Sequence, residues 1–143
     1  MLLILDSNVY IFALGAVRDP LCENLFNLIA KNPERIFIRI PRLILTEVRH
    51  NLTIEAFKEF MLFLHKRTII DEDSEIPFEL GSKYEAMNLK PADALIAAYA
   101  EYVGAEILVS ENRHFLTRHH ARLPFKICNA ETCLNLIKAT LKK

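Results

Sequence analysis

The chain has 143 residues, of which 52% are hydrophobic and 25% are charged, and its 18 acidic residues balance its 18 basic residues. This length is typical of a single domain, residues 1–143, and the aliphatic content excludes a disordered chain. A net charge of zero argues against a protein that coats nucleic acid with a basic surface, although acids gathered in a metal site would mask basic groups elsewhere.

The sequence gives no support for a membrane protein, a secreted protein or a zinc-binding protein. Its charge-free apolar runs are far shorter than the roughly 20 residues that span a bilayer, and the N-terminal run reaches Asp6 without the basic region of a signal peptide. The odd number of cysteines lacks C-x-x-C spacing, which indicates reduced thiols rather than a structural zinc site: Cys22, Cys128 and Cys133. We therefore expect a cytoplasmic protein that does not enter a membrane.

Short apolar runs without alternation predict the strands. Such runs are typical of parallel strands that are covered on both faces. The predicted strands are residues 2–5, 36–38, 68–70 and 106–109, with 125–127 as a further candidate.

The segments between these strands have the apolar spacing of helices. Their starts are marked by residues that cap or open a helix, namely Asp19-Pro20, Pro41, Thr53 and Pro91. We also expect a weaker helix over 76–84, an end to the Pro91 helix at Gly104, and a last helix over 130–141. Strands that alternate with helices predict an α/β fold, a three-layer sandwich around a short, mostly parallel central sheet.

Three acidic residues stand beside apolar elements. Asp6 directly follows the first strand, Glu47 lies at the border of a helix's apolar stripe, and Asp93 begins a helical run that is otherwise uncharged. Isolated buried carboxylates are costly, so such acids usually have a cationic partner, and Lys90 is the one nearby candidate for Asp93. Taken singly, Asp6 is also explained as a helix cap, and Asp93 as a favourable charge at a helix N-terminus.

The predicted sheet gathers these acids. Functional residues of open parallel sheets lie beyond the carboxyl ends of the strands, where Asp6 and the segment Ser110-Glu111-Asn112 are both expected. Carboxylates from separate elements, without His or Cys ligands, form an all-oxygen site that suits Mg²⁺ or Mn²⁺. Such an ion activates water and neutralises charge on a phosphate, which is the chemistry of phosphodiester hydrolysis.

Four segments together resemble a known family. In order and spacing they are similar to the motifs of PIN-domain nucleases, most closely the small ribonuclease toxins of VapBC toxin–antitoxin pairs: Leu5–Val9, Thr46–Val48, Pro91–Ala98 and Leu108–Phe115. The resemblance covers essentially the whole chain. It implies a single PIN-like domain, a Mg²⁺- or Mn²⁺-dependent endoribonuclease, a homodimer, and an antitoxin protein as a partner besides RNA.

The resemblance also assigns the acids of the site. It places Asp6 and Asp93 on the core metal ligands of the family, and Glu47 on an acid that holds the ion directly or through water. Asn112 stands at the fourth catalytic position, where the family usually has Asp, and His114 stands where another Asp is frequent. The neutral amide of Asn112 removes charge from the site, which weakens the expectation of a second metal ion.

Further residues would support this site. Ser7 and Ser110 match small hydroxyl positions that steady the acids or the attacking water, and Asn8 and Glu111 flank them. Glu111 either compensates for Asn112 or faces elsewhere. A basic cluster follows the Glu-Asn motif, and we expect three of its members to contact the RNA backbone: Arg113, Arg118 and His119.

Two other interpretations stay open at the level of sequence. One is a catalytically impaired PIN-like module that binds RNA or a protein, with Asn112 as the mark of lost activity. Metal-dependent cleavage that disappears in Asp6→Asn would separate it from the nuclease. The other is a response-regulator-like domain with an acidic pocket, which would need a lysine at a strand end that this chain lacks.

Overall fold

The computed structural model describes residues 1–65, 68–117 and 122–143. Five strands form one sheet in the order β3-β2-β1-β4-β5, and every pairing is parallel. The strands are β1 (Leu2–Leu5), β2 (Phe37–Pro41), β3 (Thr68–Asp71), β4 (Ile107–Val109) and β5 (Lys126–Cys128). The expected parallel sheet is confirmed, and the candidate fifth strand is a strand.

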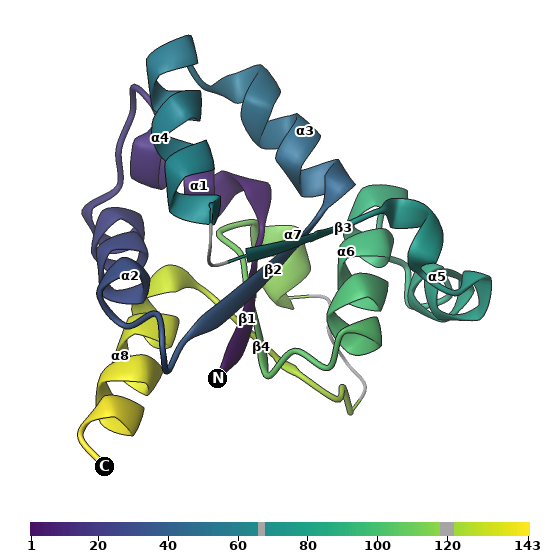
Figure 1. Ribbon diagram of the computed structural model, residues 1–143. Helices are drawn as coiled ribbons and strands as arrows, with labels where there is room; N and C mark the ends of the chain where they lie inside the picture. Colours follow the sequence, from purple (N-terminus) through teal and green to yellow (C-terminus); the bar gives the residue numbers. More distant parts are fainter. Residues whose placement is uncertain (66–67, 118–121) are drawn as a thin grey trace.

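Helices cover both faces of this sheet. They are α1 (Ser7–Leu14), α2 (Pro20–Lys31), α3 (Arg42–Asn51), α4 (Ile54–Leu64), α5 (Phe78–Glu85), α6 (Pro91–Tyr102), α7 (Arg113–Thr117) and α8 (Ala130–Leu141), with a 3₁₀ turn η1 (Asp73–Glu75) before α5. Figure 1 shows α1, α2, α4 and α8 on one side of the sheet and α5 and α6 on the other. The three-layer α/β sandwich is thus confirmed.

The strand order explains which helices lie on which face. From β1 the chain steps outward to β2 and then β3, and right-handed crossovers place the intervening helices on one face. From β3 it returns across the sheet to β4, so the same handedness places α5 and α6 on the opposite face. As a result α3 and α6, which carry Glu47 and Asp93, approach the carboxyl edge of the sheet from different directions.

The middle of the sheet and helix α6 form the centre of the core. Leu3, Ile4 and Leu108 of the two central strands are fully buried. Helix α6 contributes Ala97, Ala98 and Ala100, which are also fully buried. Most residues of α6 from Asp93 to Ala100 are buried, and this explains why its sequence is apolar on most sides rather than amphipathic. No helix within the described parts of the chain is long and apolar enough to cross a membrane.

Two of the expected helix starts are wrong, both near prolines. Pro41 does not open a helix: it is the last residue of β2, pairs with Asp71 and has extended φ and ψ angles of −80° and 154°. The helix expected over 76–84 begins only at Phe78, because Pro77 disfavours a helical conformation for the preceding Ile76.

Tyr10 of α1 provides a test of the packing. Its ring is fully buried and meets Phe60 edge-on at 4.9 Å, while its hydroxyl has no hydrogen-bond partner among the described residues. A buried polar group without a partner costs about 1–3 kcal/mol. We expect Tyr10→Phe to raise the free energy of unfolding by about 1 kcal/mol, measured by urea denaturation.

A second tyrosine is the matched control. The hydroxyl of Tyr84 is bonded to Glu101 at 2.8 Å, so Tyr84→Phe should instead lower the free energy of unfolding. A loss of stability in Tyr10→Phe would contradict the expectation and indicate a buried water bound to that hydroxyl.

Candidate active site

Asp6 occupies the junction of β1 and α1. Its backbone N–H bonds to the carbonyl of Val109 at 2.8 Å, which joins it to the end of β4. Its carboxylate is 4% exposed and accepts the N–H of Ser7 at 2.8 Å and the hydroxyl of Ser110 at 2.7 Å. Asp6 therefore caps α1 and also presents a carboxylate at the carboxyl edge of the sheet, so the two interpretations of this residue are compatible.

Ser7 connects Asp6 to the second acid. The Ser7 hydroxyl donates to the carboxylate of Glu47 at 2.5 Å, while its N–H donates to Asp6. Glu47 lies in the middle of α3 and is half-buried, as expected for the border of an apolar stripe. Ser7 thus bonds to carboxylates from two different elements, which are 41 positions apart in the chain.

Asp93 approaches from the other face of the sheet. It lies in the first turn of α6 and is 9% exposed, and no N–H or O–H group of the described residues donates to its carboxylate. A small pocket of about 80 Å³ opens beside it, lined by Asn88, Leu89, Lys90 and His114. Asp93 thus combines a carboxylate that accepts no donor from the described residues with a position on the wall of a pocket.

The pKa values place the three acids in one electrostatic environment. Burial raises the pKa of Asp6, hydrogen bonds from Ser110 and Ser7 partly oppose this, and the charges of Asp93 and Glu47 raise it further. Burial also raises the pKa of Asp93, and the charge of Glu47 adds to it, while Lys90 and His114 lower it. The charge of Glu47 therefore acts on both Asp6 and Asp93, and that of Asp93 acts on Asp6, although the three acids come from separate segments.

Asn112 and Glu111 organise the neighbouring helices. The side-chain oxygen of Asn112 accepts the N–H of His114 at 3.0 Å, which stabilises the start of α7. Glu111 accepts the N–H of Ala130 at 2.8 Å at the start of α8, and its own N–H donates to the side chain of Asn8 at 3.2 Å. Glu111 therefore faces α8 and does not take the place of an acid at position 112.

The predicted RNA contacts are only partly described. Arg113 is exposed at the first position of α7, next to Asn112. Arg118 and His119 lie outside the described residues, so their expected contacts with RNA stay predictions. The three cysteines are buried and free, as expected for reduced thiols: Cys22, Cys128 and Cys133.

The donor atoms of this site suit a hard divalent ion. Within the described parts of the chain, no group of three or more His, Cys, Asp or Glu side chains is already arranged to hold a metal by itself. Mg²⁺ does not require such a cage, because it is usually held by one or two carboxylates and keeps several of its waters. The carboxylates of Asp6 and Asp93, both buried at the carboxyl edge of the sheet, would supply ligands of this kind.

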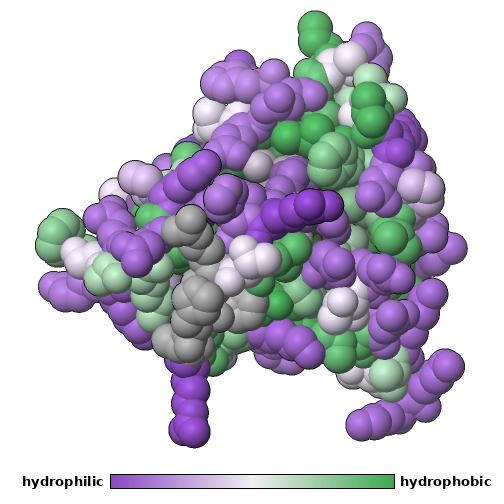
Figure 2. Space-filling view, turned by 180° about the vertical axis from the view of Figure 1, so that it is seen from behind, coloured by the Kyte–Doolittle hydropathy of each residue, from purple (hydrophilic) through white to green (hydrophobic). Residues whose placement is uncertain are grey.

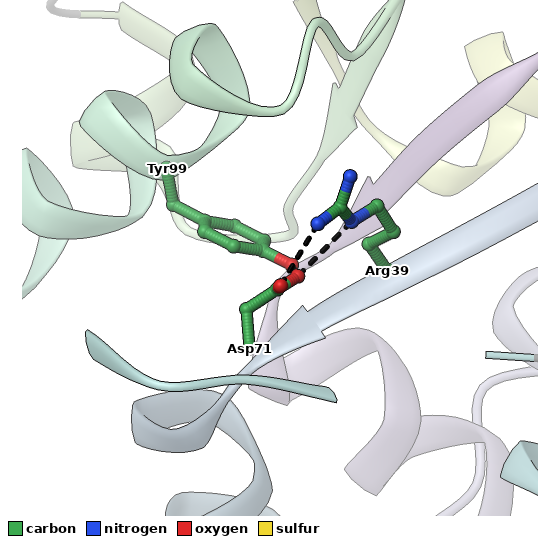
Figure 3. Close-up of polar contacts among 3 residues, drawn as sticks. All are labelled: Arg39, Asp71 and Tyr99. Carbon is green, nitrogen blue, oxygen red and sulfur yellow. Dashed lines mark hydrogen bonds and ion pairs between the residues drawn. The ribbon is translucent and has the colours of Figure 1, made fainter. Parts of the chain in front are cut away.

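Sequence reasoning missed another acid at the same edge of the sheet. Asp71 ends β3, is 6% exposed, and accepts two hydrogen bonds from Arg39, at 3.0 Å from Nε and 2.8 Å from Nη2. The hydroxyl of Tyr99 in α6 donates to the same carboxylate at 2.5 Å (Figure 3). The signal in the sequence is the one that identified Asp6, namely an acid directly after an apolar run.

Comparison with known families agrees with this geometry. The sequence profile of the PIN domain matches residues 3–119. The chain belongs to the PIN-domain family. This family consists generally of nucleases, and the matched region includes Asp6, Glu47, Asp93 and Asn112. Comparison with curated proteins gave no match.

Two solved structures share the fold of this chain. One is VapBC2 from Rickettsia felis bound to a DNA fragment from their promoter, with a TM-score of 0.62 and 22% identity. The other is FitAcB from Neisseria gonorrhoeae, with a TM-score of 0.56 and 16% identity. Each alignment covers 90% of this chain and 98% of the other chain.

The raised pKa of Asp93 gives a test of the site that requires no substrate. Because its pKa lies above the ordinary value of 3.8 in the folded PIN domain, the wild type loses stability as the pH rises from 3.8 through the folded pKa. Asp93→Asn removes this charge, so we expect it to raise the free energy of unfolding by about 0.5–2 kcal/mol at pH 7 without divalent metal.

The pH dependence and a control make this test specific. The gain should disappear below pH 3.8, where the wild-type carboxyl is also neutral. Glu131→Gln changes an exposed acid in the first turn of α8 and should give no such gain. Destabilisation by Asp93→Asn at pH 7 would show instead that the interaction of Asp93 with the helix dipole dominates.

Proposed function

We propose that this PIN domain is a Mg²⁺- or Mn²⁺-dependent endoribonuclease that hydrolyses RNA phosphodiester bonds and acts as the toxin of a toxin–antitoxin pair. The observation that carries this proposal is the meeting of three carboxylates from β1, α3 and α6 at the carboxyl edge of a parallel sheet, two of them buried with raised pKa values. Membership of a family of nucleases supports the reaction class.

In this proposal Asp6 and Asp93 would hold the ion, and Glu47 would hold it directly or through water. The ion, when bound, would activate a water molecule and stabilise the charge that develops on the phosphate. The Ser110 hydroxyl fixes the orientation of Asp6, and the Ser7 hydroxyl fixes that of Glu47, so these serines position the acids without contacting the ion. Asp93 lines the pocket, and none of the described residues donates a hydrogen bond to its carboxylate.

Exposed cations beside the acids suit a polyanionic substrate. Lys90 and His114 line the pocket next to Asp93, and Arg113 is exposed on α7. Phosphate contacts of this kind position a nucleic acid without reading its sequence. The balanced net charge is consistent with this arrangement, because the acids offset basic groups elsewhere on the surface.

We propose two protein partners, an antitoxin and a second copy of this chain. The VapBC2 complex, with which this chain shares its fold, supports the first. Large apolar side chains are exposed on α4 at Ile54 and Leu62, at 72% and 76%, and we propose that a protein partner covers them. Figure 2 shows apolar groups interspersed with hydrophilic ones on the side of the molecule where α2 and α4 lie.

The proposed activity is tested by cleavage of a mixed, structured RNA with Mg²⁺, Mn²⁺ or EDTA. We expect the wild type to cleave only with metal, and Asp6→Asn and Asp93→Asn to lower the rate by about 100-fold or more, since each removes charge that holds the ion. Glu131→Gln, in the first turn of α8, is the matched acid-to-amide control and should retain full activity.

The outcomes separate the nuclease from a binding module. Cleavage that persists in EDTA, or in Asp93→Asn, would contradict the metal site. A folded wild type that binds RNA but cleaves none, with either metal, would instead support the catalytically impaired module and give Asn112 its explanation.

The fourth position gives an independent prediction. Aspartate caps helices as well as asparagine does, so Asn112→Asp should preserve the bond to the His114 N–H while it adds a carboxylate near the acids. We expect it to strengthen Mn²⁺ binding by about tenfold, because affinity follows the number of charged ligands. Isothermal titration with Mn²⁺ measures this change, and an unchanged affinity would show that position 112 lies outside the metal site.

A further inference from the structure

Three consecutive acids at the end of β3 each bond to a different part of the fold. We call residues Asp71–Asp73 the acid clamp. Asp71 bonds to β2 and α6, Glu72 to the first residue of α3, and Asp73 to the second. The contacts are Arg39 and Tyr99 for Asp71, Arg42 Nη2 for Glu72 at 2.7 Å, and the Leu43 N–H for Asp73 at 3.1 Å.

Asp71 is the buried centre of this clamp. Burial acts to raise its pKa, but hydrogen bonds from Arg39 and Tyr99 outweigh burial and hold the pKa below its ordinary value. Asp71 is therefore ionised at neutral pH, and its bonds to the guanidinium and the phenol are charge-assisted. Figure 3 shows Arg39 and Tyr99 converging on this one carboxylate from the sheet and from the helix above it.

The elements that meet at the clamp carry two of the acids of the proposed site. Helix α3 begins at Arg42 and carries Glu47, and helix α6 carries both Asp93 and Tyr99, six residues apart. Glu47 and Asp93 repel each other, as the pKa of Asp93 reflects. The clamp thus connects two helices whose acids would otherwise tend to separate.

We infer that the acid clamp positions the metal site, with Asp71 as the positioning residue that sets the distance between Glu47 on α3 and Asp93 on α6. This inference rests on the proposed function. Asp71 does not contact the ion; it acts through Tyr99, Arg39 and the start of α3. Breaking the clamp weakens metal binding because the two acids then move apart.

The chain contains a matched internal control with the same chemistry. Tyr84 of α5 is also a buried tyrosine whose hydroxyl bonds to a carboxylate that pairs with a cation, here Glu101 and Lys83, at 2.8 Å and 2.6 Å. This second network joins α5 to the end of α6 and does not reach α3. Tyr84→Phe and Tyr99→Phe therefore make the same chemical change, but only Tyr99→Phe loosens the connection between Glu47 and Asp93.

The test measures Mn²⁺ binding to the metal-free protein by the electron paramagnetic resonance of free Mn²⁺, with thermal unfolding followed in parallel. We expect Tyr99→Phe to raise the Kd for Mn²⁺ by about threefold to tenfold. This is less than the roughly 10–100-fold loss of affinity on mutation of a residue that hydrogen-bonds directly to a metal-ligating side chain. Tyr84→Phe should lower the unfolding temperature by a similar amount and leave the Kd unchanged. Glu72→Gln, at an exposed bond to Arg42, should shift the Kd in the same direction as Tyr99→Phe.

Each outcome identifies which proposal fails. A wild type that binds no Mn²⁺ would overturn the proposed metal site and this inference together. A wild type that binds Mn²⁺ while Tyr99→Phe binds it equally well, or no more weakly than Tyr84→Phe, would overturn the positioning role and leave the proposed function intact.

Discussion

The repulsion among Asp6, Glu47 and Asp93 is the constraint on which the rest of this structure depends. Each acid is at least half-buried, and burial raises the pKa of Asp6 and Asp93. A fold that gathers like charges must supply stability from elsewhere. Here the parallel sheet and the largely buried helix α6 supply it, because their apolar contacts do not depend on the charges at the edge.

The hydrogen bonds around the acids are of two kinds: some reach the carboxylates of Asp6 and Glu47, and others hold the segments beside them. Ser7 and Ser110 contact carboxylates directly, so they fix the orientation of Glu47 and Asp6. Asn8, Glu111 and the amide of Asn112 bond to backbone or helix ends one step further away. Within the described parts of the chain no group donates a hydrogen bond to the carboxylate of Asp93, in contrast to those of Asp6 and Glu47. This asymmetry suits a ligand that completes the site when it binds.

Buried Asp71 shows how the same residue type serves a different purpose. It ends a strand, but the charge of Arg39 and hydrogen bonds from Arg39 and Tyr99 stabilise its ionised form, so its pKa is lowered where that of Asp6 is raised. Asp71 thus has a cationic partner within the fold, whereas the acids near Asp6 raise its pKa instead of lowering it. The partners, rather than the position at a strand end, therefore distinguish the two.

The sequence by itself determined the parallel α/β architecture and the edge of the sheet at which Asp6 lies. Uniformly apolar strands require cover on both faces, and this fixed the three layers and placed Asp6 and Ser110 at one edge. The start of α3 was not predictable from local signals, because Pro41 extends β2 by pairing with the distant residue Asp71. The later start of α5 has a local cause, since Pro77 disfavours a helical conformation at Ile76.

Only the tertiary structure decided which polar side chains meet. Glu111 and Asn112 are adjacent in sequence, yet the side chain of one faces α8 and that of the other caps α7. Asp71, Arg39 and Tyr99 come from three segments and form one network that no local pattern indicates. The periodicity of apolar residues predicts which face of a helix or strand is buried, because that face is defined by the spacing of residues within one element. The partners of a buried charge depend on how crossovers bring separate helices to the same strand end, and this is a property of the whole fold.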